Sequence, residues 1–431
     1  MKVLKVKFRN FFSSLFSENS RNTLYLYFYQ TIEYIFLFFL IIYINRRIGV
    51  NYFGKYMFAY AIIQYFSIFV DFGFDLSATK TVSIYRNSKR KLSYIFSTVL
   101  LSRTVLMILS ALIYFSFVYL FVKESDRSFF ILMFGLVVAR AYMPFFFFLG
   151  IENLYQVVLS NIVSKTIVAF CMFLMVKDSN SFSFLPGILS VIFLLQSVYL
   201  IIHAFRKFEL KFIGFTKYKV ILNALRKNFN IFLGNSASSM YITSNTFLLG
   251  LLSSDYLYVA YYSLAEKIVR ICRYIISPYT QAIFPKFAQK AYRQGKGRAI
   301  SDLLSLIRNI VPFLIGIQIL LLFVSPLAII LFTGNFIKRV FFDIIILSSI
   351  LSVGTVNNIL AVLGLINLAL YSLFRNIIFL AGLVNLVLTV FLAKYFLDIG
   401  ASISLMLTEI FLLILLLKVI LKKNVRIQYD S

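Results

Sequence analysis

The heptad YRNSKRK at Tyr85–Lys91 has a counterpart, YRQGKGR at Tyr292–Arg298, about half of the 431-residue chain further on. Each is an aromatic and basic turn between long apolar segments. Two more matches keep the same order: YFGKYMFAYAI precedes the first heptad and YVAYYSLAEKI the second, and a single arginine, Arg103 or Arg308, follows each heptad inside the next apolar segment. Matches in register indicate an internal duplication. We therefore expect two halves of the same build and orientation.

The composition excludes a water-soluble globular protein. Hydrophobic residues make up 61% of the chain and charged residues 14%, whereas soluble domains average about 45–50% and about 25%. About 20 apolar residues cross a hydrocarbon core of about 30 Å. On that scale the chain is an all-α polytopic membrane protein with twelve transmembrane helices, predicted at 24–44, 56–78, 92–121, 128–150, 155–176, 183–204, 229–252, 257–284, 300–324, 340–366, 371–393 and 400–421.

The twelve spans divide into two lobes of six helices each. The predicted parts are an N-terminal cytoplasmic segment over 1–23, an N-terminal lobe over 24–204, a basic cytoplasmic linker over 205–228, a C-terminal lobe over 229–421 and a cytoplasmic tail over 422–431. In the first segment, apolar residues at helical spacing alternate with lysines and arginine, which is typical of a helix lying on the inner leaflet. A disordered basic tail is the alternative interpretation of that segment.

The orientation follows from the lysines and arginines of the connectors, because cytoplasmic loops are enriched in both. With the N-terminus inside, cytoplasmic segments carry 27 of them and the opposite face carries 9. Both termini are therefore predicted to be cytoplasmic. The net charge of +27 then reflects topology and contact with anionic membrane lipids, and no nucleic-acid partner is expected.

Several kinds of site are excluded by the residues present. The two cysteines, Cys171 and Cys272, both fall inside apolar spans, and His203 is the single histidine, so neither a disulfide framework nor a metal site is expected. The chain has no phosphate-binding loop of the G-x-x-x-x-G-K-[ST] type, so no ATPase is built into it. No cofactor and no enzymatic activity are predicted.

Seven cationic residues are predicted to lie within spans and away from the ends that are counted with the connectors. Each costs about 2.5–3.5 kcal/mol at the centre of a lipid-facing helix, so they must reach the interface, form ion pairs or line a water-filled cavity. In the eighth span Glu266, Arg270 and Arg273 recur at helical spacing with Ser277, and Lys267 flanks them. A Glu266–Arg270 pair that only neutralises itself is the alternative. The candidate substrate-binding residues are Arg103, Arg140, Lys165, Lys267, Arg270, Arg273 and Arg308.

Acidic residues at depth are candidates for ion coupling, because buried carboxylates in transporters carry protons or sodium ions. The candidates are Glu33, Asp71, Asp75 and Glu266. Two others, Asp343 and Glu409, are expected instead to be structural partners of basic residues. If coupling exists, the ion is H⁺ or Na⁺.

Four stretches resemble one family. RRIGVNYFGKYMFAYAIIQYFSIFVDFGFDLSATKTVSIYRN, FFLGIENLYQV, YYSLAEKIVRICRYIISPYTQAIFPK and NNILAVLGL occur in the order found in bacterial Wzx-type O-antigen flippases. That resemblance covers most of the chain. It implies two six-helix lobes that form a V around a central cationic cavity, as in the superfamily of multidrug-extrusion and lipid II flippase proteins.

The resemblance also implies a function. The expected activity is export of an undecaprenyl-pyrophosphate-linked oligosaccharide from the inner to the outer leaflet of the bacterial inner membrane, with an O-antigen polymerase and a chain-length regulator as candidate partners. A multidrug extruder of the same fold is the alternative, although a cavity for cationic drugs would favour carboxylates. An O-antigen polymerase or ligase fits less well, because the large extracytoplasmic loop of those proteins is missing.

Overall fold

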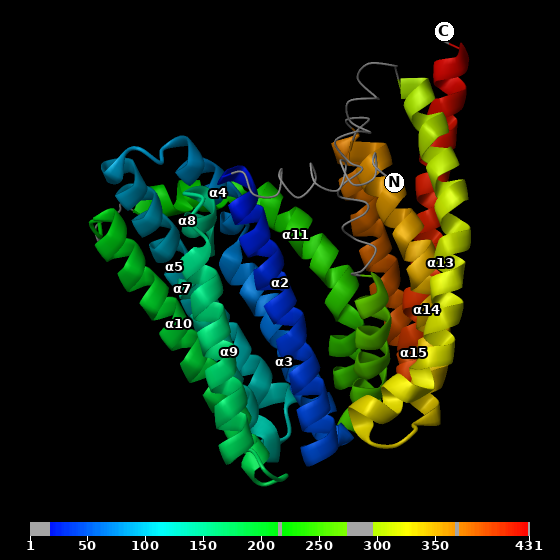
Figure 1. Cartoon of the computed structure of the whole chain (residues 1–431), viewed down its shortest axis with the longest axis horizontal. Coiled ribbons are helices and arrows are strands. Elements are labelled where there is room, and N and C mark those ends of the chain that lie inside the picture. The colour runs from blue at the N-terminus through cyan, green and yellow to red at the C-terminus, as the bar shows by residue number, and fades with distance from the viewer. Residues whose placement is uncertain (1–17, 214–217, 274–295, 367–369, 430–431) are drawn as a thin grey trace, which may run out of the picture. The chain divides into compact units, whose positions relative to one another are not determined.

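The computed structural model describes residues 18–213, 218–273, 296–366 and 370–429, which are helices and connectors without any strand (Figure 1). The first half contains α2 Glu18–Tyr43, η1 Ile44–Ile48, α3 Val50–Asp71, α4 Phe74–Ile84, α5 Lys89–Phe121, η2 Glu124–Asp126, α6 Arg127–Met133, α7 Gly135–Tyr142, α8 Phe145–Gly150, α9 Tyr155–Met175, η3 Ser181–Phe184 and α10 Leu185–Phe208. The second half contains α11 Tyr218–Leu252, a helix over 256–273, α13 Lys296–Thr333, α14 Lys338–Asn358, η4 Ile359–Ile366 and α15 Tyr371–Tyr429.

Among the described residues, nine helical stretches are long and apolar enough to cross a membrane. The prediction of an all-α polytopic membrane protein is confirmed. The last stretch contains Leu397, whose φ of 56° and ψ of −127° are not helical, so α15 is two helices joined at a kink that falls between the last two predicted spans. The predicted eighth span, 257–284, is described only as far as residue 273. The count of twelve stays a prediction.

The chain forms two compact units whose boundaries differ from a simple division into halves. One unit contains the described parts of 1–43 and 62–236, and the other contains 44–61 and the described parts of 237–431. The segment 44–61 precedes most of the first unit in sequence, yet it packs with the second. The predicted arrangement of two lobes around a cavity stays a prediction.

In the first unit, a helix break sets the direction of two carboxylates. Phe72 and Gly73 have φ values of 47° and 78°, so α3 ends and α4 begins within two residues. A Cβ on Gly73 would lie 2.7 Å from Cγ2 of Ile231, and the Phe72 ring stacks on Phe232 with centroids 4.3 Å apart. These contacts stabilise the helix break. They offset the cost of the left-handed backbone conformation at Phe72, which is unfavourable for a residue other than glycine.

In the second unit, the segment 44–61 packs closely on the helix over 256–273. A Cβ on Gly54 would lie 1.9 Å from the carbonyl oxygen of Tyr256 and 3.0 Å from the amide nitrogen of Ala260. Gly54 and Ala260 occupy matching positions in the repeated stretches YFGKYMFAYAI and YVAYYSLAEKI. The duplicated sequences therefore contact each other, and only a glycine permits so close a backbone approach.

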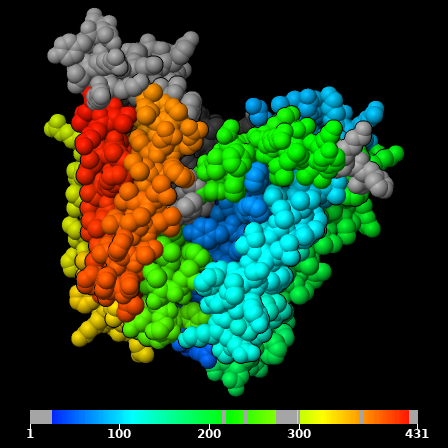
Figure 2. Space-filling view, turned by 180° about the vertical axis from the view of Figure 1, so that it is seen from behind, coloured from blue at the N-terminus to red at the C-terminus, as the bar shows by residue number. Residues whose placement is uncertain are grey.

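The two halves of α15 run side by side, orange and red in Figure 2, and share a buried polar layer with α11. Nδ2 of Asn385 donates to Oδ1 of Asn245 over 2.7 Å, and Oγ1 of Thr389 contacts Oγ of Ser404 over 2.8 Å. Oγ1 of Thr408 donates to Oδ1 of Asn385 over 3.2 Å. Such side-chain hydrogen bonds stabilise helix contacts within an apolar environment.

Candidate functional site

The first unit gathers four of the predicted site residues into one charge cluster. Arg103 is 1% exposed, and its guanidinium bonds Asp71 and also Asp75, over 2.7 Å. Its other terminal nitrogen donates to the carbonyl oxygen of Met143 over 3.1 Å. Arg140, on α7, lies 2.5 Å from the second oxygen of Asp75. The helix break at Phe72–Gly73 makes this possible, because it turns α4 so that both aspartates reach the same guanidinium.

The charges of this cluster balance, with two arginines and two aspartates in contact. A buried arginine is tolerated in a membrane protein only with such partners. Arg140 differs from Arg103 in that 38% of its side chain is exposed. Arg140 can therefore meet a charged molecule from outside the cluster, whereas Arg103 is enclosed and holds α3, α4 and α5 together.

A second ion pair joins α2 to α9. Lys165 pairs with Glu33, and Nδ2 of Asn161 donates to the same carboxylate over 2.9 Å. The Lys165 side chain is 8% exposed and the Glu33 side chain 43%. A predicted binding cation and a predicted coupling acid thus meet each other.

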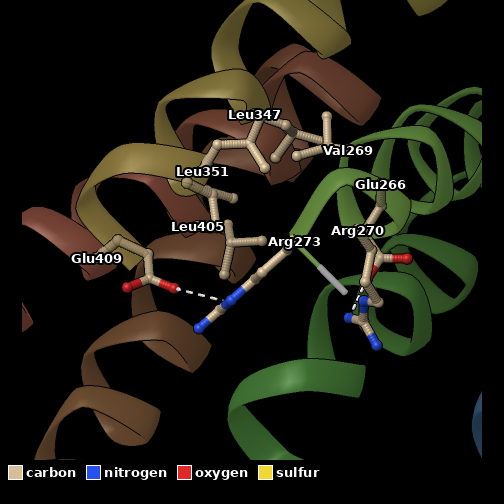
Figure 3. A pocket seen from close by; sticks show the side chains of 9 residues that line it. Glu266, Val269, Arg270, Arg273, Leu347, Leu351, Leu405 and Glu409 are labelled. Atoms are coloured by element: carbon tan, nitrogen blue, oxygen red, sulfur yellow. Dashed lines mark ion pairs between the residues drawn. The ribbon is translucent and has the colours of Figure 1, made fainter. Parts of the chain in front are cut away.

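The second unit contains a pocket that confirms the predicted helix face. Glu266, Arg270 and Arg273 all line it, from the helix over 256–273, and Glu409 lies opposite on α15 (Figure 3). Leucines of α14 and α15, together with Ile350 and Val269, form the apolar part of its wall. The pocket encloses about 450 Å³, its open mouth included. The predicted fourth member of the face, Ser277, lies outside the described residues.

Each arginine of the pocket is held by a carboxylate. Arg270 pairs with Glu266, which also accepts a bond from Lys267 over 2.9 Å. Arg273 lies 3.9 Å from Glu409 and donates to the carbonyl oxygen of Gly354 over 3.1 Å. The Glu266–Arg270 pair considered in the sequence analysis therefore exists, together with a second arginine that it does not neutralise.

Glu409 also fits its prediction as a structural partner. Besides Arg273, it accepts a hydrogen bond of 2.6 Å from Nδ2 of Asn357. The lining of the pocket carries two arginines and two glutamates, so its formal charges cancel. An entering anion would have to compete with the glutamates for the arginines.

Arg308 is placed differently from its repeat counterpart Arg103. It lies on an exposed position of α13, three turns from the start of that helix. An arginine near a helix end can reach the interface along its apolar stem. Arg308 belongs neither to the Arg103 cluster, nor to the Lys165–Glu33 pair, nor to the pocket of the second unit.

Asp398 and its partner Arg339 are not among the site residues predicted from the sequence. Nε of Arg339 lies 2.7 Å from one oxygen of Asp398 and 2.8 Å from the other. Arg339 was assigned to a connector, and Asp398 follows the kink at Leu397, where a connector was also predicted. The signal that could have identified them is an acidic residue in the otherwise apolar stretch FLDIGAS. The polar layer around Asn245 was missed as well, because uncharged amides in apolar spans give little signal.

A comparison with models of protein families shows to which family the chain belongs. The model of the family described as "Polysaccharide biosynthesis protein" matches residues 20–291, more than half of the chain. The chain belongs to this family. The resemblance to Wzx-type flippases is thereby confirmed at the family level. Two relatives share the name "Putative O-antigen transporter": one from Escherichia coli (strain K12), 25% identical over 90% of this chain and 93% of its own, and one from Shigella dysenteriae, 24% identical over 93% of this chain and 99% of its own.

Solved structures of two transport proteins share the fold of this member of the polysaccharide biosynthesis family. The lipid II flippase MurJ in an inward closed conformation matches with a TM-score of 0.69 and 12% identity, over 95% of this chain and 90% of that chain. An inward-facing multidrug resistance MATE family transporter matches with a TM-score of 0.69 and 12% identity, over 94% and 96%. These relatives are flippases and transporters by name, in agreement with the prediction that the chain is not an enzyme.

Proposed function

We propose that this protein flips an undecaprenyl-pyrophosphate-linked oligosaccharide, a repeat unit of O-antigen or a similar surface polysaccharide, from the cytoplasmic to the periplasmic leaflet of the inner membrane by alternating access. The names of the two relatives that align over nearly their whole length support the substrate class. Both termini are proposed to be cytoplasmic. An O-antigen polymerase and a chain-length regulator would receive the product.

The observation that carries the proposal is the pair of arginines in the pocket of the second unit. A pyrophosphate is a compact anion, and the planar guanidinium of arginine can donate two parallel hydrogen bonds to its oxygens. Arg270 and Arg273 lie on one helix face and are each about one-third exposed. Their carboxylate partners would hold them in place between passages of substrate and release them when phosphate oxygens compete.

The test is a double-variant cycle at Arg270 and Glu266. If Arg270 contacts the pyrophosphate, Arg270→Ala removes a charge-assisted hydrogen bond of about 1.5–3 kcal/mol, which is about a ten- to hundredfold loss of productive binding. Glu266→Gln, which frees Arg270, is expected to keep transport. The double variant is expected to remain as defective as Arg270→Ala. Transport is scored by complementation of surface polysaccharide at matched protein levels.

The control for this cycle is Lys338→Ala, which removes an exposed positive charge at the start of α14 in the same unit. It is expected to transport like the unchanged protein. If the double variant transports normally, Arg270 serves only as the partner of Glu266 and the proposed contact is wrong. Cells with and without the protein are also compared for their accumulation of a cationic drug. Equal accumulation would show that the protein is not a multidrug extruder.

We propose that transport is coupled to a proton or sodium gradient, because the chain has no nucleotide-binding loop to supply energy. Reconstituted vesicles with lipid-linked oligosaccharide and an imposed gradient test the coupling. Transport that is insensitive to both gradients would contradict it and would indicate downhill flipping, drawn by polymer assembly.

A further inference from the structure

Two carboxyl groups of the second unit lie against each other in the protein interior. Asp343, on α14, and Asp398, directly after the kink in α15, are both 0% exposed. Oγ of Ser402 donates to Oδ1 of Asp343 over 2.7 Å. Oδ2 of Asp343 is buried and receives no hydrogen bond from a donor in the described part of the chain. Ser402 follows Asp398 by one helical turn, and Arg339, which bonds Asp398, precedes Asp343 by one helical turn, so α14 and α15 bring the two acids together.

The one guanidinium beside the pair bonds only Asp398. Arg339 contacts the two oxygens of Asp398 through Nε, and the ring of Tyr258 covers its guanidinium at 4.8 Å from the ring centroid. No ion pair between Arg339 and Asp343 is formed. Asp343 was predicted to be the structural partner of a basic residue, but the nearby Arg339 bonds Asp398 instead.

The other ion-pair clusters differ from this one in their charge. Asp71 and Asp75 have Arg103 and Arg140, Glu33 has Lys165, and Glu409 has Arg273; Glu266 has both Arg270 and Lys267. Each of these clusters has at least as many cations as carboxylates. The Asp343–Asp398 pair has two carboxyl groups and one cation. With both acids ionised, it would leave one uncompensated negative charge in an apolar interior, which is strongly unfavourable.

We propose that Asp343 and Asp398 form a proton-binding site in which one exchangeable proton is shared by the two carboxyl groups and carries the coupling of transport. The proton comes from hydronium, which transfers it to a carboxylate oxygen and leaves as water. When the site deprotonates, the reverse transfer restores hydronium. The coupling role rests on the proposed function, whereas the existence of the site does not.

The surroundings assign the proton to Asp343. Asp398 has Arg339 on both oxygens and stands at the start of the second half of α15, where the positive end of the helix dipole favours a carboxylate. Asp343 has only the hydroxyl of Ser402. The other titratable groups that face the pair belong to the helix over 256–273, namely the tyrosines Tyr258, Tyr261 and Tyr262. None of them is cationic, so none replaces the proton.

Arg339 gives the site a route to water. Its side chain is 36% exposed, whereas Asp398, which it contacts, is fully buried. In the predicted topology this end of α14 faces the periplasm. A proton that enters there meets the carboxyl pair when Arg339 turns away from Asp398. Protonation also removes one negative charge beside Arg339 and so weakens the contact that closes this end of the unit.

The test uses dicyclohexylcarbodiimide, which reacts with protonated carboxyl groups in apolar surroundings and not with carboxylates. The full chain is labelled in vesicles over a series of buffers from acidic to alkaline, and each peptide is quantified by mass spectrometry. The Asp343 peptide is expected to be labelled and to lose label as the pH rises. The Glu409 peptide serves as the internal comparison and is expected to stay unlabelled, because its carboxylate is paired with Arg273.

The amide of Asp343→Asn has the shape of a protonated carboxyl group, so the variant protein is expected to fold. Because an amide does not react with the carbodiimide, the peptide that contains residue 343 is expected to be unlabelled. In vesicles with an imposed proton gradient, this variant is expected to lose the stimulation of transport by the gradient. An Asp343 peptide without label in protein that transports would overturn the site. Protection by sodium at constant pH would also overturn it, because the bound ion would then be sodium. If Asp343 of the unchanged protein is labelled but the proton gradient does not stimulate its transport, the coupling role is wrong and the proton-binding site is still supported.

Discussion

At the scale of single residues, Arg103 bonds Asp71, Asp75 and the carbonyl oxygen of Met143. Arg103→Ala would leave the buried Asp71 without its ion-pair partner and Asp75 with Arg140 alone, and removing one member of a buried ion pair costs about 3–5 kcal/mol. We expect a clear fall in the midpoint of thermal unfolding in detergent. Arg308→Ala, the variant at the repeat counterpart, is expected to leave that midpoint unchanged because Arg308 is exposed.

The comparison between these two variants also tests the interpretation of the cluster. Arg103→Lys keeps the charge but loses the fork that reaches both aspartates and the Met143 carbonyl oxygen. We expect an intermediate midpoint. Equal midpoints for Arg103→Ala and the unchanged protein would show that the cluster does not stabilise the first unit.

The stability of the connector before α10 is expected to depend on pH through the carboxyl group of Asp178. The backbone N–H and the hydroxyl of Ser181 both donate to Oδ1 of Asp178 over 2.8 Å, and these bonds hold the pKa of Asp178 below its ordinary value of 3.8. A carboxyl group with a lowered pKa stabilises the folded connector above its unfolded pKa, and this contribution is lost as the pH falls through the folded pKa. We expect hydrogen-exchange protection of the Ser181 amide at neutral pH and its loss under strong acid. Asp178→Ala should lack the protection at neutral pH.

At the scale of helices, the close approach of α3 to the helix over 256–273 gives a sharp prediction. Gly54→Ala would place a methyl group 1.9 Å from a backbone oxygen, which no rotation of a side chain can relieve. We expect destabilisation of about 3 kcal/mol or more, as for severe overpacking. The readout is thermal unfolding in detergent.

The matched control is Gly316→Ala on α13, where an added Cβ would have no atom within 4 Å. Alanine favours a helix over glycine by about 0.5–1 kcal/mol, so this variant is expected to be neutral or slightly stabilised. A Gly54→Ala protein as stable as Gly316→Ala would contradict the described packing.

The helices show what could be predicted from the sequence and what could not. The 3.6-residue period places Glu266, Arg270 and Arg273 on one face, and the pocket confirms that face. Their partner Glu409 comes from a distant segment, and local periodicity carries no information about which distant side chains meet. The Asp71–Asp75 arrangement depends on two left-handed residues, Phe72 and Gly73, and Phe72 gave no sequence signal for such a backbone.

At the scale of the whole molecule, hydropathy and the repeat were sufficient for the class and for most of the spans, because lipid requires long apolar helices whatever their tertiary contacts. The composition of the units was not predictable in the same way. The repeated stretches were identified as equivalent, but equivalence did not reveal that they contact each other. The contact depends on Gly54 and Ala260 being small, a property shared by many positions in any membrane helix.

The topology is testable over the whole chain. Reporter fusions at Lys217 and Arg293 are expected to be cytoplasmic, and fusions at Asp178 and Asp255 are expected to be periplasmic, because basic connectors stay inside. Alkaline phosphatase activity and green fluorescence report the two sides. A reversed pattern would contradict the orientation, and two neighbouring fusions on the same side would contradict the count of spans between them.

The membership of residues 44–61 in the second unit has a consequence for biosynthesis. The ribosome completes this segment long before it makes the helix over 256–273, against which Gly54 packs. During translation, the surface around Gly54 must therefore contact lipid or an insertion factor until its packing partner has been synthesised. The second unit can fold completely only after the earlier part of the chain is in the membrane. A gene cut between the halves would yield a C-terminal fragment without one of its own packing segments, so its accumulation in the cell should depend on simultaneous synthesis of the N-terminal fragment.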